Sequence, residues 1–391
     1  METAVPIKTS IKVKAGSASS TSAEKPASKA IFSFFAGAGF LDLGFEHSGF
    51  ETVYVNEYHK PFLDAYKHSR KILGIAEPEF GYDSEDIKNL LKPQKNSELE
   101  KIVIQAKNAY DVVGFIGGPP CPDFSIGGKN KGKEGKNGVL SKVYVDIIAR
   151  QLPDFFLFEN VKGLWSTKRH REFYDSLKRK LQRSGYVLSD RLINSIEYGA
   201  AQDRNRIILI GFHKDFLARQ AKATNAIDFP WNTGKKHERS ILANTWPGTN
   251  PFRANSKTKI PSGVDKELTI SFWFEKNDVD NHPNSTDFFK PKAALPKFKS
   301  IPEGDVSKKS FKRLHRWRYS PTAAYGNNEV HIHPFKPRRI TVAEALAIQS
   351  LPKNYELPKD MTLSNKFKAV GNGVPYLAAK GVADAIKHFL A

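Results

Sequence analysis

Short apolar runs that end in glycine or a polar residue recur along the first half of the chain. They predict strands at 31–35, 51–56, 112–116, 155–158 and 207–212. Segments of helical pattern such as 173–184 lie between them, and this alternation predicts a doubly wound, mostly parallel α/β sheet. Ligands bind outside the carboxyl ends of the strands in such sheets, so the glycines and acids at those ends mark the expected site.

Composition and apolar pattern divide the chain into four segments. Residues 1–29 are rich in Ser, Ala, Thr and Lys without apolar periodicity, which predicts a disordered basic tail that either attracts phosphates or is a dispensable leader. Residues 30–220 carry the strand and helix pattern. Residues 221–330 are loops rich in Lys, Asn, Pro and Trp, which indicates a second, smaller and irregular domain. Regular structure returns in 331–391.

The helices of this last segment have recognisable ends. Thr341 followed by Glu344 has the spacing of a capping box, so we expect a helix over 340–348. The final helix is expected over 376–390, after the glycine-rich run 370–375.

The chain carries a large positive charge. Lys and Arg number 61 against 41 Asp and Glu, a net charge of +20 over 391 residues. Such an excess indicates a polyanionic partner, nucleic acid first, although better solubility alone is the alternative. The sequence has no run of about 18 apolar residues and no apolar leader, so we expect a soluble protein of the cell interior.

Cys121 is the sole cysteine of the sequence. A single thiol excludes an intramolecular disulfide and a multi-cysteine zinc site, and it leaves a buried apolar filler or a nucleophile. The preceding Gly-Gly-Pro-Pro at 117–120 makes a rigid strand exit that places the thiol on a loop, a poor position for core filler. The loop up to Lys133 has glycines that permit closure over nucleic acid and lysines that favour the thiolate.

A glycine turn with Gly37 and Gly39 joins the first strand to a helix, and Glu57 follows the second strand. Such a turn lets a ligand approach the backbone, and an acid at the next strand end binds ribose hydroxyls. Asp42 stands where a dinucleotide fingerprint has its third glycine, so the pattern of nicotinamide dehydrogenases fails. Asp86 either reaches an adenine amino group or is an ordinary surface residue.

Further polar residues follow the fourth strand and precede the fifth. Glu159 supplies a carboxylate, and Arg204 and Arg206 project to one side if the chain is extended there. An arginine pair holds a carboxylate, a base or a phosphate, and structural salt bridges are an equal alternative. His331 and His333 have no partner ligands nearby in the sequence, and we interpret them as structural.

Taken in order, these motifs resemble those of the C5-cytosine DNA methyltransferases. They are Phe35-Ala36-Gly37-Ala38-Gly39, Asn56-Glu57, Gly117-Gly118-Pro119-Pro120-Cys121, Glu159-Asn160-Val161, Gln202-Asp203-Arg204-Asn205-Arg206 and Gly371-Asn372-Gly373-Val374. The resemblance covers nearly the whole chain outside the tail and the irregular domain, and the order of the motifs is highly specific. Pro122, where many members have Gln, is a departure that leaves details of the loop open.

The resemblance implies methyl transfer from S-adenosylmethionine to C5 of a cytosine flipped out of double-stranded DNA. Cys121 would add to C6, because C5 is too weakly nucleophilic to take a methyl group directly. Glu159 would bind N3 and the amino group, Arg206 would orient the base, and Arg204 or Gln202 would support the loop. The expected substrate-binding residues are Ser125, Lys129 and Gln202.

The resemblance also implies a cofactor site, and no metal is expected. Glu57 would bind the ribose, Tyr58 would pack on the adenine, and Asp86 and Ile87 would contact the adenine edge. The cofactor-binding residues expected in this way are Phe35, Ala36, Gly37, Ala38, Gly39, Glu57, Tyr58, Asp86, Ile87, Pro120, Asn372 and Val374.

Each segment gains a role from the same resemblance. Residues 30–220 would be the catalytic and cofactor-binding domain. Residues 221–330 would be the target recognition domain, facing the major groove. Residues 331–391 would return to the catalytic domain.

Other functions fit parts of the pattern. A tRNA cytosine methyltransferase shares the framework but carries a Cys-Phe-Thr signature, and two-cysteine RNA methyltransferases need a second cysteine that this sequence lacks. A catalytically silent DNA-binding regulator would not need Cys121, Glu159 and Arg206 together. A nicotinamide dehydrogenase explains neither Pro-Pro-Cys nor the basic charge.

A chain of little more than catalytic and recognition domains resembles prokaryotic restriction-modification methyltransferases more than the multidomain eukaryotic enzymes. We therefore expect a cytoplasmic, nucleoid-associated monomer that protects host DNA. Its cognate restriction endonuclease is expected to act separately.

Overall fold

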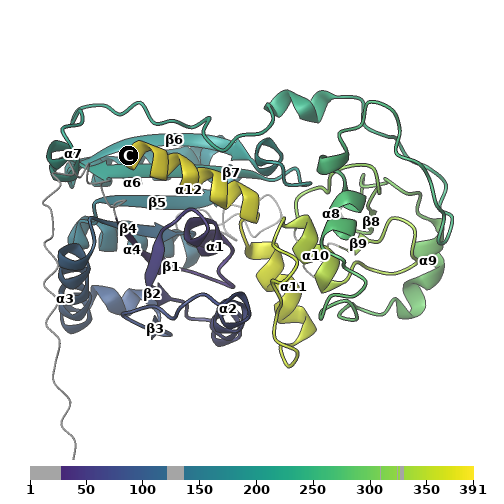
Figure 1. The fold of residues 1–391 in the computed structure, drawn as a ribbon, viewed down its shortest axis with the longest axis horizontal. Helices are drawn as coiled ribbons and strands as arrows, with labels where there is room; N and C mark the ends of the chain where they lie inside the picture. Colours follow the sequence, from purple (N-terminus) through teal and green to yellow (C-terminus); the bar gives the residue numbers. More distant parts are fainter. Residues whose placement is uncertain (1–27, 121–135, 309, 324, 326–329) are drawn as a thin grey trace, which may run out of the picture.

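The computed structural model of the chain describes residues 28–120, 136–308, 310–323, 325 and 330–391 (Figure 1). A larger lobe built on a β-sheet lies beside a smaller lobe with little regular structure. No helix within these described ranges is long and apolar enough to cross a membrane.

The larger lobe is built on one sheet, to which the described residues contribute seven strands. They are β1 (Lys29–Phe34), β2 (Glu51–Asn56), β3 (Tyr82–Asp83), β4 (Val112–Gly117), β5 (Phe155–Val161), β6 (Tyr186–Asn194) and β7 (Asn205–His213). Their order is β3-β2-β1-β4-β5-β7-β6. β7 runs antiparallel to both neighbours and every other pair is parallel, so the mostly parallel sheet expected from the sequence is confirmed.

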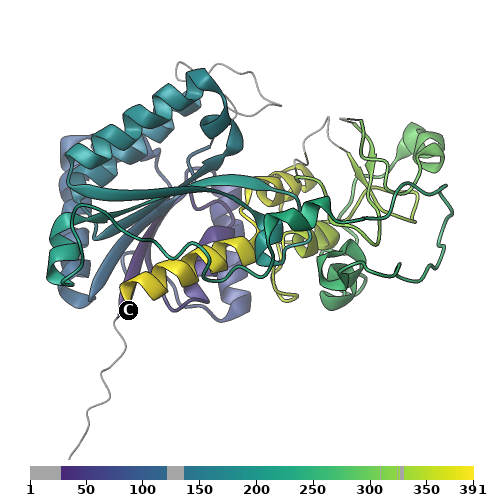
Figure 2. The same ribbon diagram turned by 90° about the horizontal axis from the view of Figure 1, so that it is seen from above.

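Helices cover both faces of this sheet (Figure 2). Phe32 and Phe34 of β1 point to one face, and Ile31 points to the other, because successive side chains of a strand alternate. The first face packs against α3 (Pro93–Ala109), α4 (Lys136–Gln151) and α6 (Lys168–Arg183). The second face packs against α1 (Phe40–Glu46), α7 (Lys214–Arg219) and α12 (Tyr376–Leu390).

α1 and α12 come from opposite ends of the described chain and touch closely. A Cβ on Gly44 of α1 would lie 2.6 Å from the backbone nitrogen of Lys380 in α12. Ser48, just after α1, donates its hydroxyl to the carboxylate of Asp384 at 2.7 Å. The last helix is therefore an integral part of the larger lobe.

The strand register brings the carboxyl ends of the parallel strands to one edge. Phe34 at the end of β1 pairs with Asn56 and with Gly117, and Gly117 pairs with Phe158. The segments that follow β1, β2, β4 and β5 therefore begin next to one another.

The sequence predicted the bounds of β2 and α12 to the residue. Thr341 and Glu344 form the expected capping box at α10 (Val342–Ile348). β5 extends beyond the expected end at 158 and includes Glu159. β3 and β6 were not expected; β6 has a partly exposed Ser189 and Asp190 in its middle, which interrupt the apolar run.

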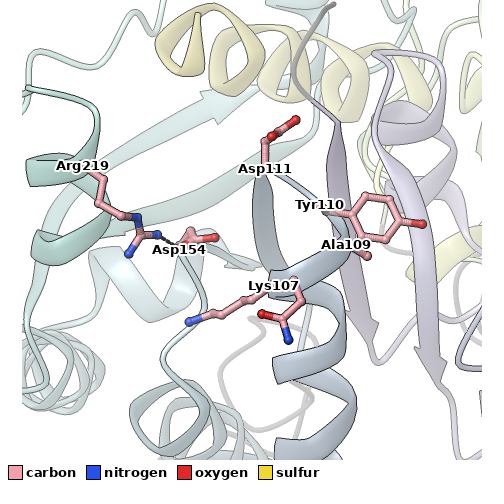
Figure 3. A pocket seen from close by; sticks show the side chains of 7 residues that line it. Lys107, Ala109, Tyr110, Asp111, Asp154 and Arg219 are labelled. Atoms are coloured by element: carbon pink, nitrogen blue, oxygen red, sulfur yellow. Dashed lines mark hydrogen bonds and ion pairs between the residues drawn. The ribbon is translucent and has the colours of Figure 1, made fainter.

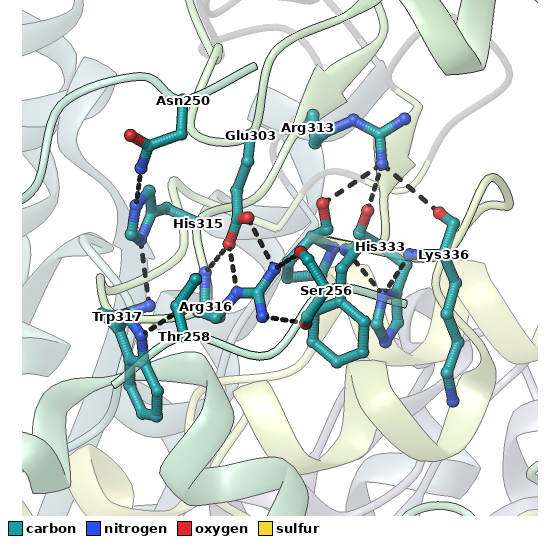
Figure 4. A network of polar contacts seen from close by, with 12 residues as sticks. Asn250, Ser256, Thr258, Glu303, Arg313, His315, Arg316, Trp317, His333 and Lys336 are labelled. Atoms are coloured by element: carbon teal, nitrogen blue, oxygen red, sulfur yellow. Dashed lines mark hydrogen bonds and ion pairs between the residues drawn. The ribbon is translucent and has the colours of Figure 1, made fainter. Parts of the chain in front are cut away.

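Buried arginines hold the second lobe together where regular structure is sparse (Figure 4). Arg316 forms an ion pair with Glu303 at 2.8 Å and donates to the hydroxyl of Ser256 at 2.8 Å. Arg313 donates to the carbonyl of His333 at 2.5 Å. One guanidinium has five donors, so these residues satisfy carbonyls that would otherwise need strand partners.

The remaining elements belong to both lobes. They are α2 (Lys60–Leu73), η1 (Ile87–Leu91), α5 (Lys162–Ser166), η3 (Ser195–Tyr198), η4 (Arg239–Ala243), η5 (Lys266–Leu268), α8 (Ile270–Lys276), η6 (Lys292–Ala294), α9 (Leu295–Ser300), β8 (Lys312–Arg313), β9 (His331–Ile332) and α11 (Leu363–Asn372).

The domain bounds expected at 221 and 331 do not coincide with the two lobes. Residues after 221 still contact the larger lobe, and residues after 331 still belong in part to the second lobe. Trp231 donates its indole N–H to Ser189 at 2.8 Å, and Arg239 pairs with Glu197 at 2.7 Å, so the chain beyond 221 still packs on the larger lobe. β9 pairs with β8 in the second lobe.

Candidate active site

The glycine turn after β1 is open on one side, at Gly37, and packed against the protein on the other, at Gly39. Phe35, Gly37 and Gly39 have φ angles of 55°, 59° and 79°, in the left-handed region. A Cβ on Gly37 would meet nothing within 4 Å, whereas one on Gly39 would lie 2.4 Å from Nη1 of Arg70. The backbone at Gly37 is therefore accessible to a ligand, while that at Gly39 rests against the protein.

Glu57 ties this turn to the end of β2. Its carboxylate accepts from the backbone N–H of Gly37 at 2.8 Å and from that of His59 at 2.7 Å. Burial raises the pKa of Glu57, and these two bonds oppose the rise. The neighbouring Tyr58 is 70% exposed. An exposed ring beside a carboxylate and an open glycine backbone fits a nucleoside, with the ring for the base and the carboxylate for the ribose.

Asp86 and Ile87 begin η1 next to this edge. Asn56 at the end of β2 donates to the carbonyl of Glu85 at 3.1 Å, which holds the segment close. The carboxylate of Asp86 caps η1 by accepting from the backbone N–H of Lys88 at 3.0 Å. The side chain of Ile87 is buried in the core, so this residue has only its backbone to offer a ligand.

Residues 371–374, from the far end of the chain, also reach this edge. A Cβ on Gly373 would lie 2.1 Å from the ring of Phe40, which directly follows the glycine turn. Val374 is buried and Asn372 is exposed. The chain between Asn372 and Val374 therefore lies against the residue that follows the turn.

The strand exit that leads to Cys121 packs against Glu159. A Cβ on Gly118 would lie 2.7 Å from Oε2 of Glu159. Asn160, the next residue of β5, donates its amide to the carbonyl of Pro119 at 3.4 Å. The end of β5 thus holds the exit from β4, and the carboxylate of Glu159 packs against Gly118, three residues before the cysteine in the sequence.

Glu159 forms an ion pair with Arg206. Its Oε1 lies 2.7 Å from Nε of Arg206, and both side chains are 11% exposed. Burial raises the pKa of Glu159, and the charges of Arg206 and Arg204 oppose the rise. Among the described residues no hydrogen bond to Oε2 of Glu159 is found.

Arg204 and Gln202 are buried and bond to the backbone of other segments. Arg204 donates to the carbonyls of Ala323 and Gly371, each at 2.8 Å. Gln202 accepts from the backbone N–H of Ala323 at 3.2 Å and donates to the carbonyl of Ile348 at 3.4 Å. Both side chains therefore connect the start of β7 to neighbouring segments, while Arg206 alone of the expected pair reaches Glu159.

Three expected site residues, Cys121, Ser125 and Lys129, lie outside the described residues. Pro120 is the last described residue before them and is exposed. The roles of all three stay predictions.

A separate cavity of about 420 Å³ lies at the amino ends of β4 and β5 (Figure 3). Arg219 pairs there with Asp154 at 2.7 Å, and Lys107 donates to the carbonyl of Leu152 at 2.6 Å. These charged groups already bind within the protein, and the cavity is at the sheet edge opposite the glycine turn. It is therefore not the candidate active site.

The two histidines near residue 330 are buried. Burial lowers the pKa of His331 to about 3. Nδ1 of His333 accepts from the backbone N–H of Phe335 at 3.2 Å and of Lys336 at 3.0 Å. Within the described ranges no group of three or more His, Cys, Asp or Glu side chains is placed to hold a metal ion.

The mostly parallel sheet with helices on both faces and the glycine turn after β1 define the class of the protein as a doubly wound α/β fold. A DNA modification methyltransferase encoded within an E. coli prophage has a similar structure, with a TM-score of 0.61 over 93% of this chain and 99% of that chain at 21% identity. Spodoptera frugiperda DNMT2 gives a TM-score of 0.55 over 92% of this chain and 99% of that chain at 17% identity. At such identities the likeness shows the fold.

The chain belongs to the C-5 cytosine-specific DNA methylase family, whose model matches residues 30–388. It is 56% identical over 363 residues to type II methyltransferase M.NmeDI of Neisseria meningitidis serogroup C, covering 92% of this chain and 84% of the relative. It is 29% identical over 381 residues to type II methyltransferase M.FnuDI of Fusobacterium nucleatum, covering 92% and 94%. The family resemblance expected from the motifs is confirmed, and the protein is a DNA cytosine-5 methyltransferase.

Proposed function

We propose that the protein methylates C5 of a flipped-out cytosine within a short DNA sequence, as the modification enzyme of a type II restriction-modification system. Its relatives named above are type II methyltransferases, and a net charge of +20 suits a DNA duplex. The observation that carries the proposal is the place of Glu159, a buried carboxylate packed against the strand exit that leads to the sole cysteine.

Cys121 is the proposed nucleophile. Its thiolate sulfur forms a bond to C6 of the cytosine, and the electron pair of the C5–C6 double bond becomes available at C5. After C5 is methylated, C5 loses its proton. The electron pair of that C–H bond restores the double bond as the sulfur leaves C6, so Cys121 returns as a thiolate.

Glu159 stabilises this adduct in the proposed mechanism. Addition at C6 places negative charge on N3, and a protonated carboxyl beside N3 neutralises that charge. Burial raises the pKa of Glu159 and so favours the protonated form, while Arg206 opposes the rise and fixes the orientation of the carboxyl. Arg206 also orients the base, and Arg204 and Gln202 support the surrounding segments.

The target base must leave the duplex, because its C5–C6 edge cannot reach a thiol while stacked. Ser125 and Lys129 of the loop after Cys121 are proposed to contact the DNA when this happens. Lysine and serine side chains are suited to phosphate contacts, which position the protein on the duplex without reading its sequence.

S-adenosylmethionine supplies an electrophilic methyl group on a positively charged sulfur. Glu57 binds its ribose hydroxyls, the exposed ring of Tyr58 packs on its adenine, and Asp86 with the backbone of Ile87 binds the adenine edge. The open backbone at Gly37 gives the cofactor room against the sheet edge. The other residues proposed to line this site are Phe35, Ala36, Ala38, Gly39, Pro120, Asn372 and Val374.

The second lobe is the proposed target recognition domain. Arg253, Lys257 and Lys259 are exposed on the segment that Arg316 binds through Ser256. A rigid framework that presents cations in this way can place side chains on phosphates and base edges of the major groove. We further propose that the protein acts as a monomer on nucleoid DNA, beside a separately acting endonuclease.

Two measurements test this function. Bisulfite sequencing of plasmid DNA from cells that express the protein should show C5 methylation in a short fixed sequence, and Cys121→Ala should abolish it. DNA with 5-fluorocytosine at the target should form a covalent complex that survives denaturation, because fluorine cannot leave C5 as the proton does. Methylation that persists in Cys121→Ala would refute the mechanism.

A further inference from the structure

Two buried side chains that are remote in the sequence hold the glycine turn from behind. Arg70 of α2 donates through Nη2 to the carbonyl of Gly39 at 2.7 Å. Tyr355, between α10 and α11, donates its hydroxyl to the carbonyl of Ala38 at 2.6 Å. Arg70 is 2% exposed and Tyr355 is fully buried. Two consecutive carbonyls of the turn are thus fixed by groups that do not face the open side.

The guanidinium of Arg70 is itself fixed by contacts with Tyr66 and Glu46. Its guanidinium lies 4.1 Å from the ring centroid of Tyr66, and its Nη2 lies 3.0 Å from Oε2 of Glu46. A Cβ on Gly39 would lie 2.4 Å from Nη1, so the guanidinium is in close contact with the turn. The stack on Tyr66 and the ion pair with Glu46 already restrict the guanidinium. Its hydrogen bond to the turn therefore costs less conformational entropy.

Tyr355 is positioned by a different part of the molecule. Its ring lies edge-on to Phe40, with centroids 5.2 Å apart. Phe40 in turn contacts Gly373 of the segment that completes the sheet edge. The hydroxyl of Tyr355 therefore links the turn to the C-terminal part of the chain.

The turn needs such restraints because its backbone is unfavourable. Phe35 adopts a φ of 55°, in a region that disfavours residues with a side chain by about 1–2 kcal/mol. Such conformations persist only where the surroundings hold them. Side chains on the open side would block a ligand. Apart from Glu57 at Gly37, the side chains that bond to the turn are Arg70 and Tyr355, which lie on the side away from the open backbone.

We propose that Arg70 and Tyr355 are positioning residues for cofactor binding, which set the glycine turn in its binding conformation before the cofactor arrives. This inference rests on the proposed use of S-adenosylmethionine at the turn. Neither residue touches the cofactor in this scheme. Both act through the turn, because a preformed site loses less conformational entropy when it binds its ligand.

Tyr355→Phe tests the inference with little change of shape. We expect the Kd for S-adenosylhomocysteine, measured by calorimetry without DNA, to rise about fivefold, as the loss of one hydrogen bond of about 1 kcal/mol predicts. Arg70→Lys keeps the charge beside Glu46 but loses the guanidinium fork, and should raise this Kd about tenfold. DNA affinity in the absence of cofactor should stay unchanged in both variants.

Tyr186→Phe is the matched control. Tyr186 is also buried and donates its hydroxyl to a backbone carbonyl, that of Pro153 at 2.8 Å, near the amino end of β5. Its Kd for S-adenosylhomocysteine should equal that of the wild type, although its thermal stability should fall as that of Tyr355→Phe does.

The outcomes separate this inference from the proposed function. A wild-type protein that binds no S-adenosylhomocysteine would overturn the proposed cofactor site itself. Wild-type binding with unchanged Kd in Tyr355→Phe and Arg70→Lys would overturn the positioning role alone. An equal loss of affinity in Tyr186→Phe would also overturn it, because general loosening of the fold would then explain the effect.

Discussion

Oε2 of Glu159 lies 2.7 Å from the place that a Cβ on Gly118 would take. A side chain at position 118 would therefore collide with this acid, and residues 118–119 pack against Glu159 and Asn160. Arg206 holds the other carboxylate oxygen at 2.7 Å. The carboxylate is thus oriented within the protein itself, as preorganised catalysis requires.

Gly118→Ala should displace this carboxylate. The added methyl group forces Glu159 or the strand exit to move, so we expect single-turnover methylation to slow about tenfold or more, while S-adenosylhomocysteine binding is kept. Gly248→Ala is the control, because a Cβ there meets nothing within 4 Å and the glycine has no left-handed φ. Wild-type turnover in Gly118→Ala would show that the position of Glu159 does not matter.

Gly37→Ala tests whether the open front of the turn is a ligand site. Gly37 has a φ of 59° and Gly74, at the end of α2, has a φ of 68°, and a Cβ on either meets nothing within 4 Å. Both alanine variants should lose about 1 kcal/mol of unfolding free energy from backbone strain. Only Gly37→Ala should also lose S-adenosylhomocysteine affinity, by about tenfold or more in calorimetry. Equal affinities in the two variants would place the cofactor elsewhere.

Asp42 should make the stability of the protein depend on pH. It is fully buried, and burial raises its pKa from the ordinary 3.8 to about 6, with Arg70 opposing the rise. The folded protein therefore holds this proton more tightly than the unfolded chain, so stability falls as pH rises from about 4 to about 6.

Asp42→Asn removes that dependence. Its free energy of unfolding should match the wild type near pH 4 and exceed it above pH 6 by roughly 3 kcal/mol. Urea unfolding at several pH values measures the difference. A difference that stays constant from pH 4 to pH 7 would contradict the assignment to Asp42.

Arg316→Met should weaken DNA binding without affecting the cofactor site. The change leaves Glu303 buried without its partner, which should lower the unfolding free energy of the second lobe by about 3 kcal/mol. Electrophoretic mobility shifts should then show weaker binding to target DNA, with an unchanged Kd for S-adenosylhomocysteine. Adding Glu303→Leu should restore much of the stability, because no uncompensated charge is then buried. Loss of cofactor binding in Arg316→Met would mean that the lobes do not act separately.

The sequence predicts the sheet well where the apolar runs are unbroken. β2 and α12 have the expected bounds because their apolar residues follow the period of a strand or a helix without interruption. β6 escapes prediction because it is the edge strand of the sheet, where the partly exposed Ser189 and Asp190 and the exposed Arg191 interrupt the apolar run. β3 has only two residues and leaves no pattern.

The candidate site is predictable in its residue types and less so in its contacts. The motifs mark Glu159 and Arg206, and these two residues do meet. Nothing in the motifs shows that Gln202 is buried, because that depends on packing against the distant Ile348 and Ala323.

Arg70 was missed, yet the sequence holds a signal for it. It occupies a buried position of α2 at helical spacing from Phe62 and Tyr66, so a charged residue stands in an otherwise inward-facing stripe. Tyr355 lies in an irregular segment and leaves no comparable pattern.

The contact between α1 and α12 has a consequence for the timing of synthesis. A ribosome makes α1 early and α12 after nearly all the rest, yet each helix buries the other against the sheet. During synthesis the larger lobe therefore cannot complete its packing until the fifteen residues of α12 have been made. A chain that stops before residue 376 lacks the helix that packs on α1 and covers this face of the sheet.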